Sequence, residues 1–282
     1  MNEKANIDGG EYSFIEVIPV LDEKAKMVLC TDTAGSKFAC PEEVWLRNAL
    51  PLPIEPSAPV STNSSTQEKI ECFLSMFCGR EDLYAKRYYS MNTGKSGYTP
   101  ACKNEWAAGI CDKKAHKCPE CPNRAFQSLS TEVVKAHLMG RDPYCRDVVA
   151  IYPMLEDDTT RLLAADFDEA SWQADVAALR ETCLEYHLTP AGADVWFFFS
   201  ESVQAAEARK LGSGLLTQTM ARRHELSFAS YDRLFPAQDT LPKGGFGNLI
   251  ALPFQGQVQE NGNTLFVDAL FSPYPDQWAF LS

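Results

Sequence analysis

The sequence predicts an α/β (α+β) domain, in which helices cover a sheet, for most of its 282 residues. Short apolar runs alternate with longer amphipathic segments from residue 147 onward, which is the pattern of strands and covering helices. The composition is globular, with 45% hydrophobic and 23% charged residues. No apolar run is long enough to span a membrane.

The chain before this domain reads differently. Residues 1–50 hold short apolar segments and predict a small β-rich or mixed piece. Residues 51–66 are rich in Pro, Ser and Thr and predict a linker. A helix is expected to begin near Ser65 or Thr66, where a hydroxyl precedes acidic residues, and to stop at Gly79. The main domain is therefore expected to occupy residues 67–282, with its catalytic core over about 147–282.

The elements of that core follow in order. Residues 147–168 predict two strands around an acidic turn, and 171–188 predict a helix capped by Ser171. A strand over 193–200 and a long helix over 202–226 come next. The apolar segments 246–254 and 264–271 are expected to be further strands of the same sheet.

Four of the ten cysteines lie close together within residues 98–126. Cys102, Cys111, Cys118 and Cys121 have the spacing C-x8-C-x6-C-x2-C, and four thiolates satisfy tetrahedral Zn²⁺ without an open position. The pattern predicts a structural zinc site. There are two alternatives to four cysteine ligands. His116 could be a zinc ligand in place of one cysteine, or the four thiols could be unrelated to one another.

The other six cysteines are scattered, and we expect them to be buried as small hydrophobic side chains. They are Cys30, Cys40, Cys72, Cys78, Cys145 and Cys183.

Two acids end the apolar run LLAADFD. In a strand, Asp166 and Asp168 project from one face and Phe167 from the other. Like charges held so close favour a divalent cation between them, and Mg²⁺ prefers such carboxylates. The alternative is a solvated strand end.

A third acid and a glycine-rich loop lie further along the chain. Asp232 precedes the loop KGGFGN, which includes Lys243 and Asn248. Glycines let backbone N–H groups approach an anion, and a neighbouring lysine is a phosphate partner. Together with the acidic pair, this loop predicts a nucleotide site.

The formal net charge of −12 argues against a general polyanion-binding surface. Lys and Arg nevertheless outnumber Asp and Glu over residues 67–150, whereas acids dominate 151–282. A basic stripe of Arg80, Lys86, Arg87 and Lys95 could contact a template strand or could be an ordinary solvated surface. The N-terminus lacks an apolar signal-peptide core, so a cytoplasmic location is expected.

Several long segments resemble a known family. They are FCGREDLYAKRYYS, GKSGYTPACKNEWAAGIC, YPMLEDDTTRLLAADFD, SYDRLFPAQDTLPKGGFGNLIALPFQG and YPDQWAFLS. In this order they resemble the archaeo-eukaryotic primase domain of TOTE conflict systems and the related CRISPR-associated primase-polymerases. The resemblance runs from about residue 67 to the C-terminus.

This resemblance implies an RRM-like catalytic core with a zinc-binding insertion. It implies template-directed nucleotidyl transfer with Mg²⁺ or Mn²⁺, acting on nucleoside triphosphates and a single-stranded DNA or RNA template or primer. Asp166 and Asp168 match the family's D-x-D motif, Asp232 its third motif, and the four clustered cysteines its zinc ligands. Helicase, nuclease or CRISPR-associated modules are the implied partners in a larger defence-related protein.

One departure from the family sets two functions against each other. The family's second motif is a basic Ser/Gly loop that ends in histidine and contacts the phosphates. Here the chain reads EYHLTPAGADVWFFF, with Asp194 in the place of that histidine. The alternative to an active enzyme is therefore a weakened or inactive primase-like module that binds nucleic acid or nucleotide.

Overall fold

The computed structural model divides the chain into two compact units, Met1–Pro59 and Val60–Ser282. Each unit is described by itself. The structure describes residues 4–7, 9–19, 26–42, 44–45, 59–167, 172–188, 195–222 and 231–282. Among these residues, no helix is both long and apolar enough to cross a membrane.

The first unit is an antiparallel sheet of four strands in sequence order. The strands are β1 (Lys4–Ile7), β2 (Gly10–Pro19), β3 (Lys26–Asp32) and β4 (Lys37–Pro41). Its small core includes Val28, Cys30 and Trp45, with Phe14 packed against them. The part of residues 1–50 that the structure describes is thus rich in strand.

Helix α2 (Thr66–Met76) begins at the expected residue. Ser65 caps it by accepting from the Glu68 amide at 3.2 Å, and the Glu68 carboxylate accepts from the Ser65 amide at 2.7 Å. The chain just before α2 belongs to the second unit, since the Thr62 amide donates to Asp276 at 2.8 Å. Of the segment 51–66, residues 51–58 lie outside the described residues.

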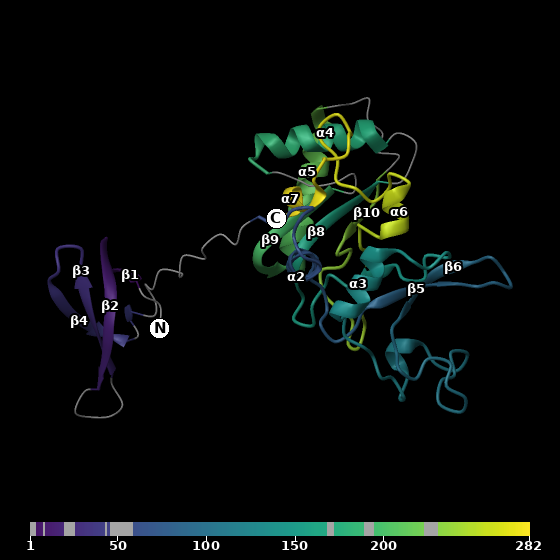
Figure 1. Ribbon diagram of the computed structural model, residues 1–282, viewed down its shortest axis with the longest axis horizontal. Coiled ribbons are helices and arrows are strands. Elements are labelled where there is room, and N and C mark those ends of the chain that lie inside the picture. Colours follow the sequence, from purple (N-terminus) through teal and green to yellow (C-terminus); the bar gives the residue numbers. More distant parts are fainter. Residues whose placement is uncertain are drawn as a thin grey trace. The chain divides into compact units, whose positions relative to one another are not determined.

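The central sheet of the second unit has three antiparallel strands in the order β10-β8-β9. Its strands are β8 (Thr159–Phe167), β9 (Val195–Gln204) and β10 (Tyr231–Phe235). Helices α4 (Trp172–Glu185) and α5 (Ala205–Arg222) both pack against β8, and Figure 1 shows them together on one side of the sheet.

Strand β8 is buried on both faces. Leu163, Ala165 and Phe167 belong to the core under α4 and α5. Leu162 and Ala164 belong to a second core that includes residues of α2, α3 (Thr131–Met139) and α7 (Gln277–Leu281). This double burial explains why β8 reads as a continuous apolar run and does not alternate with polar residues.

Gly212 allows α5 to lie close to this sheet. A Cβ at this position would lie 2.9 Å from Leu234 Cδ1 and 3.2 Å from Leu163 Cδ2, so these leucine side chains would have to shift to make room for it. Gly212 is therefore a point of close approach between α5 and the side chains of β8 and β10.

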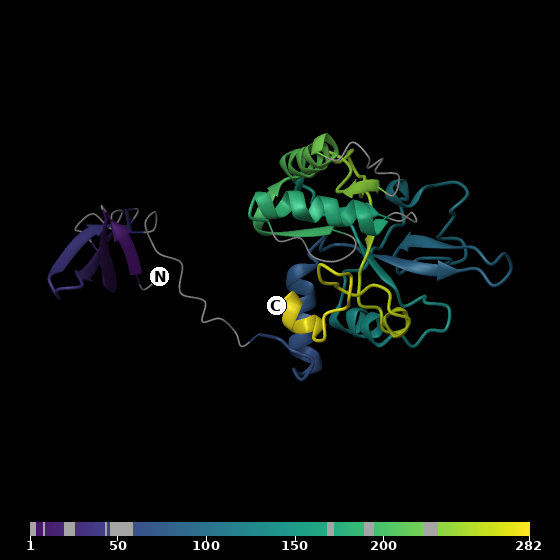
Figure 2. The same ribbon diagram turned by 90° about the horizontal axis from the view of Figure 1, so that it is seen from above.

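A second sheet has the order β11-β7-β5-β6. Its strands are β5 (Ala85–Tyr89), β6 (Ser96–Pro100), β7 (Val149–Ile151) and β11 (Ile250–Ala251). Figure 2 shows the β5–β6 hairpin projecting away from the central sheet. The short helices η1 (Cys118–Glu120) and α6 (Gly256–Glu260) complete the unit.

Two expected strands differ from the structure. Within 246–254 the two residues of β11 form a strand, and they pair with β7 and not with the sheet of β8. The prediction of a strand over 264–271 is wrong, because this segment has only an isolated bridge from Val267 to Pro273. The Asp268 carboxylate accepts from the amides of Leu270 and Ser272, and this local turn replaces strand pairing.

A buried histidine ties α3 to the second sheet. His137 is fully buried. Its Nδ1 accepts from the Val149 amide at 3.2 Å, so Nε2 carries the proton and donates to the Pro253 carbonyl at 2.8 Å. Burial lowers the pKa of His137, because the charged ring would lose its solvent, and the hydrogen bond to the Pro253 carbonyl offsets only part of this shift.

We expect acid to destabilise the second unit through His137. The unfolded chain takes up a proton near pH 6.5, whereas the folded state resists it. This stability is therefore fully present above about pH 6.5 and is lost as pH falls below it. Urea unfolding between pH 7 and pH 5 measures how the free energy of unfolding falls with pH, and the slope of this fall should be smaller in His137→Gln. It should persist in His116→Gln, whose side chain is exposed. An equal slope in both variants would contradict the assignment.

Candidate functional site

Asp166 lies one residue before the end of β8. It shares its strand face with Leu162 and Ala164, and Phe167 packs on the opposite face under α4 and α5. The structure places Phe167 on the face of Leu163 and Ala165, and strand alternation assigns Asp166 to the opposite face, as the sequence predicts. The Asp166 side chain is at the border of the core, neither fully buried nor fully exposed.

Asp232 lies next to Asp166 on the neighbouring strand. In the β10–β8 ladder Tyr231 pairs with Phe167 and Arg233 pairs with Asp166, so Asp232 occupies an irregularity between these two pairs. A bulge redirects the side chain of its extra residue and is common beside active sites. The structure thus puts the backbone positions of two of the three predicted aspartates side by side, from places far apart in the sequence.

Arg233 is a neighbour that the sequence did not single out. It forms an ion pair with Asp232, and its pairing position is opposite Asp166. The side chains of both Arg233 and Asp232 are substantially exposed. Arg233 directly follows Asp232 in the sequence, and this adjacency could have indicated it as a candidate site residue. Its position opposite Asp166 is known only from the strand register.

The remaining residues of this predicted site fall outside the structural description. Asp168 follows β8 directly, and Asp194 precedes β9 directly; both lie outside the described residues. Their roles therefore stay predictions.

The KGGFGN loop lines a cavity of about 350 Å³, and the acidic pair is not part of its lining. Lys243, Gly244 and Gly245 line it from the loop, with Arg80 and Glu156 from the segments that follow α2 and precede β8. The Arg124 and Phe126 side chains line it from the cysteine-bearing segment. The cavity is mixed in character, with three cationic side chains, two carboxylates and aromatic surface.

Arg80 holds this loop in place. Its guanidinium donates to Asp82 at 2.6 Å and to Glu156 at 2.8 Å, and also to the Gly245 carbonyl at 3.3 Å. Its side chain is 7% exposed. The hydrogen bond to Asp82 raises the pKa of Arg80, which therefore stays charged.

The structure does not bring this loop to the acidic pair. The Leu241 amide donates to Asp158 at 2.7 Å, just before β8 begins. Asp166 is at the other end of β8. An extended strand rises about 3.3 Å per residue, so the backbone positions of Asp158 and Asp166 are roughly 25 Å apart. Asn248 is half-buried two residues before β11 and does not line the cavity. The combined nucleotide site expected from Lys243 and the two aspartates is therefore two separate places in the fold.

The four clustered cysteines line one cavity. The Cys102 backbone forms an isolated antiparallel β-bridge with Phe126, and the Cys102 sulfur accepts from the Ala125 amide at 3.4 Å. Burial raises the pKa of Cys118, and the neighbouring Cys111 and Cys102 raise it further. Within the described part of the chain, no group of three or more His, Cys, Asp or Glu side chains has the geometry of a metal site.

The other sulfur and histidine predictions have mixed outcomes. His116 is exposed and does not line the cysteine cavity, so it is not placed with these thiols. Cys30 and Cys183 are buried as expected. The remaining four scattered cysteines are only partly buried: Cys40, Cys72, Cys78 and Cys145.

We expect Arg80→Gln to loosen the loop that contains Lys243. The change removes two ion pairs and leaves the Gly245 carbonyl unsatisfied, which costs about 1–3 kcal/mol. Hydrogen exchange should become faster over residues 241–247. Arg146→Gln is the matched control, because its ion pair with Asp142 is exposed and should contribute less than about 1 kcal/mol. Unchanged exchange in Arg80→Gln would show that other contacts hold the loop.

Comparison with known proteins agrees with this arrangement of mixed helices and sheets. A search of curated proteins found no match. The model of the archaeo-eukaryotic primase domain of the TOTE conflict system matches residues 68–282, which is most of the second unit and more than half of the chain. The chain therefore belongs to the TOTE conflict system archaeo-eukaryotic primase family.

Proposed function

We propose that residues 68–282 catalyse template-directed nucleotidyl transfer, making or extending a nucleic acid strand. Membership of the primase family supports a nucleotidyltransferase that acts on nucleotides and nucleic acid. The observation that carries the proposal within this chain is the β10–β8 register, in which Asp232 lies next to Asp166. Asp168 completes the proposed set of three carboxylates.

The donor set suits a divalent cation. Two carboxylates on adjacent strands repel each other unless a cation lies between them, and carboxylate oxygens are the ligands that Mg²⁺ and Mn²⁺ prefer. When bound, such ions neutralise the charge of the triphosphate and of the attacking hydroxyl. Asp166, Asp168 and Asp232 are the residues that would hold them.

The chain's own contribution is to fix these carboxylates before substrate arrives. Both flanking residues of Asp166, Ala165 and Phe167, are buried under α4 and α5, so the strand end has little freedom. Arg233 pairs with Asp232 and is available to turn to a substrate phosphate when the carboxylate takes another partner. The positive charge of Arg233 would be needed for phosphate binding, because the family's basic second motif is absent from the sequence.

The glycine-rich loop has a separate role in this proposal. Lys243 remains a phosphate ligand and Asn248 a nucleotide contact, as the sequence predicts. Because the loop lies at the opposite end of β8 from Asp166, a phosphate of the bound strand is its preferred partner. Arg124 lines the same cavity and adds to its positive charge, whereas the charge of Arg80 is balanced by Asp82 and Glu156.

The cysteine cavity is proposed as a structural zinc site. The thiols of Cys102, Cys111, Cys118 and Cys121 all line it, and Zn²⁺ accepts four thiolate ligands. Lys113 lines the same cavity and lowers the charge cost of a tetrathiolate group. Bound zinc would hold together a segment that otherwise has little regular secondary structure.

Replacement of the carboxylates should abolish strand extension. In Asp166→Asn and Asp232→Asn we expect extension of a primed template with Mn²⁺ to fall by about 100-fold or more, because each variant removes a metal ligand. Gel analysis of labelled primers measures it. Asp239→Asn is the matched control, since its exposed carboxylate pairs with Arg209 elsewhere.

Two results would overturn the enzymatic proposal. One is extension in Asp166→Asn at the rate of the unaltered chain. The other is absence of extension by the unaltered chain under all template and nucleotide combinations while it still binds template, which would identify a non-catalytic primase-like module.

Metal analysis tests the zinc proposal. The purified chain should contain about one zinc per molecule, and Cys118→Ser should lose it. Cys72→Ser should retain zinc, because this thiol is partly buried on α2, away from the cysteine cavity. A folded chain without zinc, prepared in zinc-containing medium, would refute the site.

A further inference from the structure

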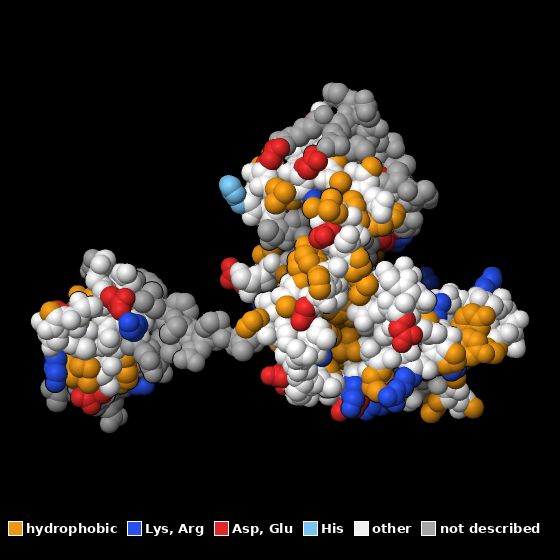
Figure 3. Space-filling view, turned by 45° about the horizontal axis from the view of Figure 1, so that its top comes forward, with side chains coloured by type: hydrophobic (Ala, Val, Ile, Leu, Met, Phe, Trp, Pro, Cys, Tyr) orange, Lys and Arg blue, Asp and Glu red, His pale blue; other side chains and the backbone are white. Residues whose placement is uncertain are grey.

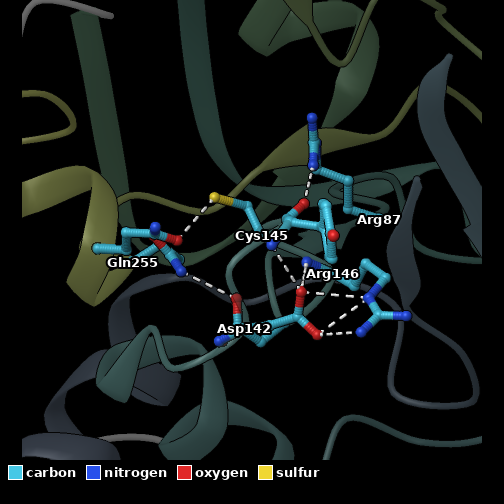
Figure 4. Close-up of polar contacts among 8 residues, drawn as sticks. Arg87, Asp142, Cys145, Arg146 and Gln255 are labelled. Carbon is cyan, nitrogen blue, oxygen red and sulfur yellow. Dashed lines mark hydrogen bonds and ion pairs between the residues drawn. The ribbon is translucent and has the colours of Figure 1, made fainter. Parts of the chain in front are cut away.

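The β5–β6 hairpin has one face that is occupied and one that is partly open, where Glu105 and Lys113 contact Lys86 and Thr99. On the occupied face, Arg87 donates to the Tyr144 carbonyl at 2.6 Å, and Tyr89 stacks on the Tyr144 ring with centroids 5.1 Å apart. Figure 4 shows Arg87 pointing into the segment that contains Asp142, Cys145 and Arg146. The opposite face includes Lys86 and Tyr88, because side chains alternate along a strand.

Tyr88 lies flat on the partly open face. It pairs with Gly97 on β6, and a Cβ at that glycine would lie 2.8 Å from the Tyr88 hydroxyl oxygen and 3.0 Å from its Cε1. The missing side chain at position 97 lets the ring rest on the hairpin backbone. The tyrosine is 45% exposed, so the outer side of its ring faces solvent.

A second exposed aromatic lies on the neighbouring cysteine-bearing segment. Trp106 is 73% exposed, although tryptophan is normally well buried. Its backbone φ of 62° is in the left-handed region, which is strained for a bulky residue. Lys113 Nζ lies 4.3 Å from the centre of its ring. Strain and exposure together indicate a side chain held out for a partner.

A buried carboxylate joins these two places. Glu105, whose side chain is 8% exposed, accepts from Lys86 at 2.7 Å and from Lys113 at 2.6 Å. Lys113 also donates to Thr99, which pairs with Lys86 across the hairpin. Burial alone would raise the pKa of Glu105, but the hydrogen bonds from Lys113 and Lys86 outweigh it and lower the pKa. The ionised Glu105 therefore anchors both lysines. Lys113 lies against the Trp106 ring, and Lys86 precedes Tyr88 by two residues on the same strand face.

The surrounding charge favours a polyanion. Between residues 85 and 126 the chain has eight Lys and Arg but three Asp and Glu, within a protein whose net charge is −12. One of these acids, Glu105, is the buried anchor of the two lysines. In Figure 3 the lobe that includes the β5–β6 hairpin shows hydrophobic side chains gathered beside Lys or Arg.

We propose that Tyr88, Lys86, Lys113 and Trp106 form a binding track for single-stranded nucleic acid. Exposed rings offer stacking surfaces to unpaired bases, and lysines between them contact the phosphates. A duplex hides its base faces, so the rings select single strands. The inference rests on the proposed function, because a primase needs a template strand, and it assigns that strand to a defined surface.

Strand binding without nucleotide or added divalent metal tests the track apart from catalysis. Fluorescence anisotropy of a labelled oligothymidylate should show a dissociation constant about tenfold higher for Trp106→Gly and for Tyr88→Ala, the loss expected for one stacked base. Glycine suits the left-handed backbone at position 106, so this variant removes the ring without adding strain. Trp106→Phe and Tyr88→Phe should largely restore binding.

The lysines should alter the salt dependence. In Lys86→Gln and Lys113→Gln, the slope of log affinity against log salt should fall by about one each. Matched controls are Tyr186→Ala, on an exposed residue just after α4, and Lys210→Gln, on the exposed side of α5. Both controls should bind as the unaltered chain does.

The proposal has clear contrary outcomes. It is overturned if both ring variants bind within twofold of the unaltered chain, if Tyr186→Ala weakens binding equally, or if duplex DNA binds as tightly as the single strand. Asp166→Asn separates this inference from the proposed function, because it should lose extension and keep strand binding. Ring-dependent binding by a chain that never extends a primer would support the track and reject the enzyme.

Discussion

Burial of β8 on both faces is the constraint on which the second unit depends. Leu163 and Ala165 pack under α4 and α5, while Leu162 and Ala164 pack against the core that includes α2 and α3. A strand packed in this way cannot slip by one residue, because every side chain would change faces. The register with β10 is therefore determined, and with it the position of Asp232 beside Asp166. A bulge in β10 is accommodated at the strand end, where the pairing can be interrupted at low cost.

The same strand also separates the two proposed sites in space. Its C-terminal end has the acidic pair. At its N-terminal end, Asp158 accepts from Leu241, two residues before the glycine-rich loop. The proposed metal-dependent reaction at one end and the proposed phosphate contact at the other suit a substrate longer than a single nucleotide. A bound nucleic acid strand has this length, whereas one triphosphate does not.

The cysteine-bearing segment is coupled to the rest of the unit by polar contacts and by the packing of Phe126. Glu105 links it to β5 through Lys86, and Arg124 and Phe126 take part in the cavity beside the glycine-rich loop. Such contacts hold this segment in position without requiring a core of its own. They also leave Trp106 and Tyr88 exposed on adjoining elements, which is the arrangement that a stacking surface requires.

By itself the sequence determined the features that depend on local chemistry. The Ser65 cap with Glu68, the apolar run that became β8, and the opposite faces of Asp166 and Phe167 follow from residue type and spacing. The family was also recognisable, because long motifs in a fixed order are more specific than composition. Only the tertiary structure decided what depends on long-range pairing. It made β11 a partner of β7, replaced an expected strand by a turn at Asp268, and set Lys243 at the far end of β8 from Asp166. It also put Asp232 next to Asp166, because strand register and core packing are determined by residues distant in the chain.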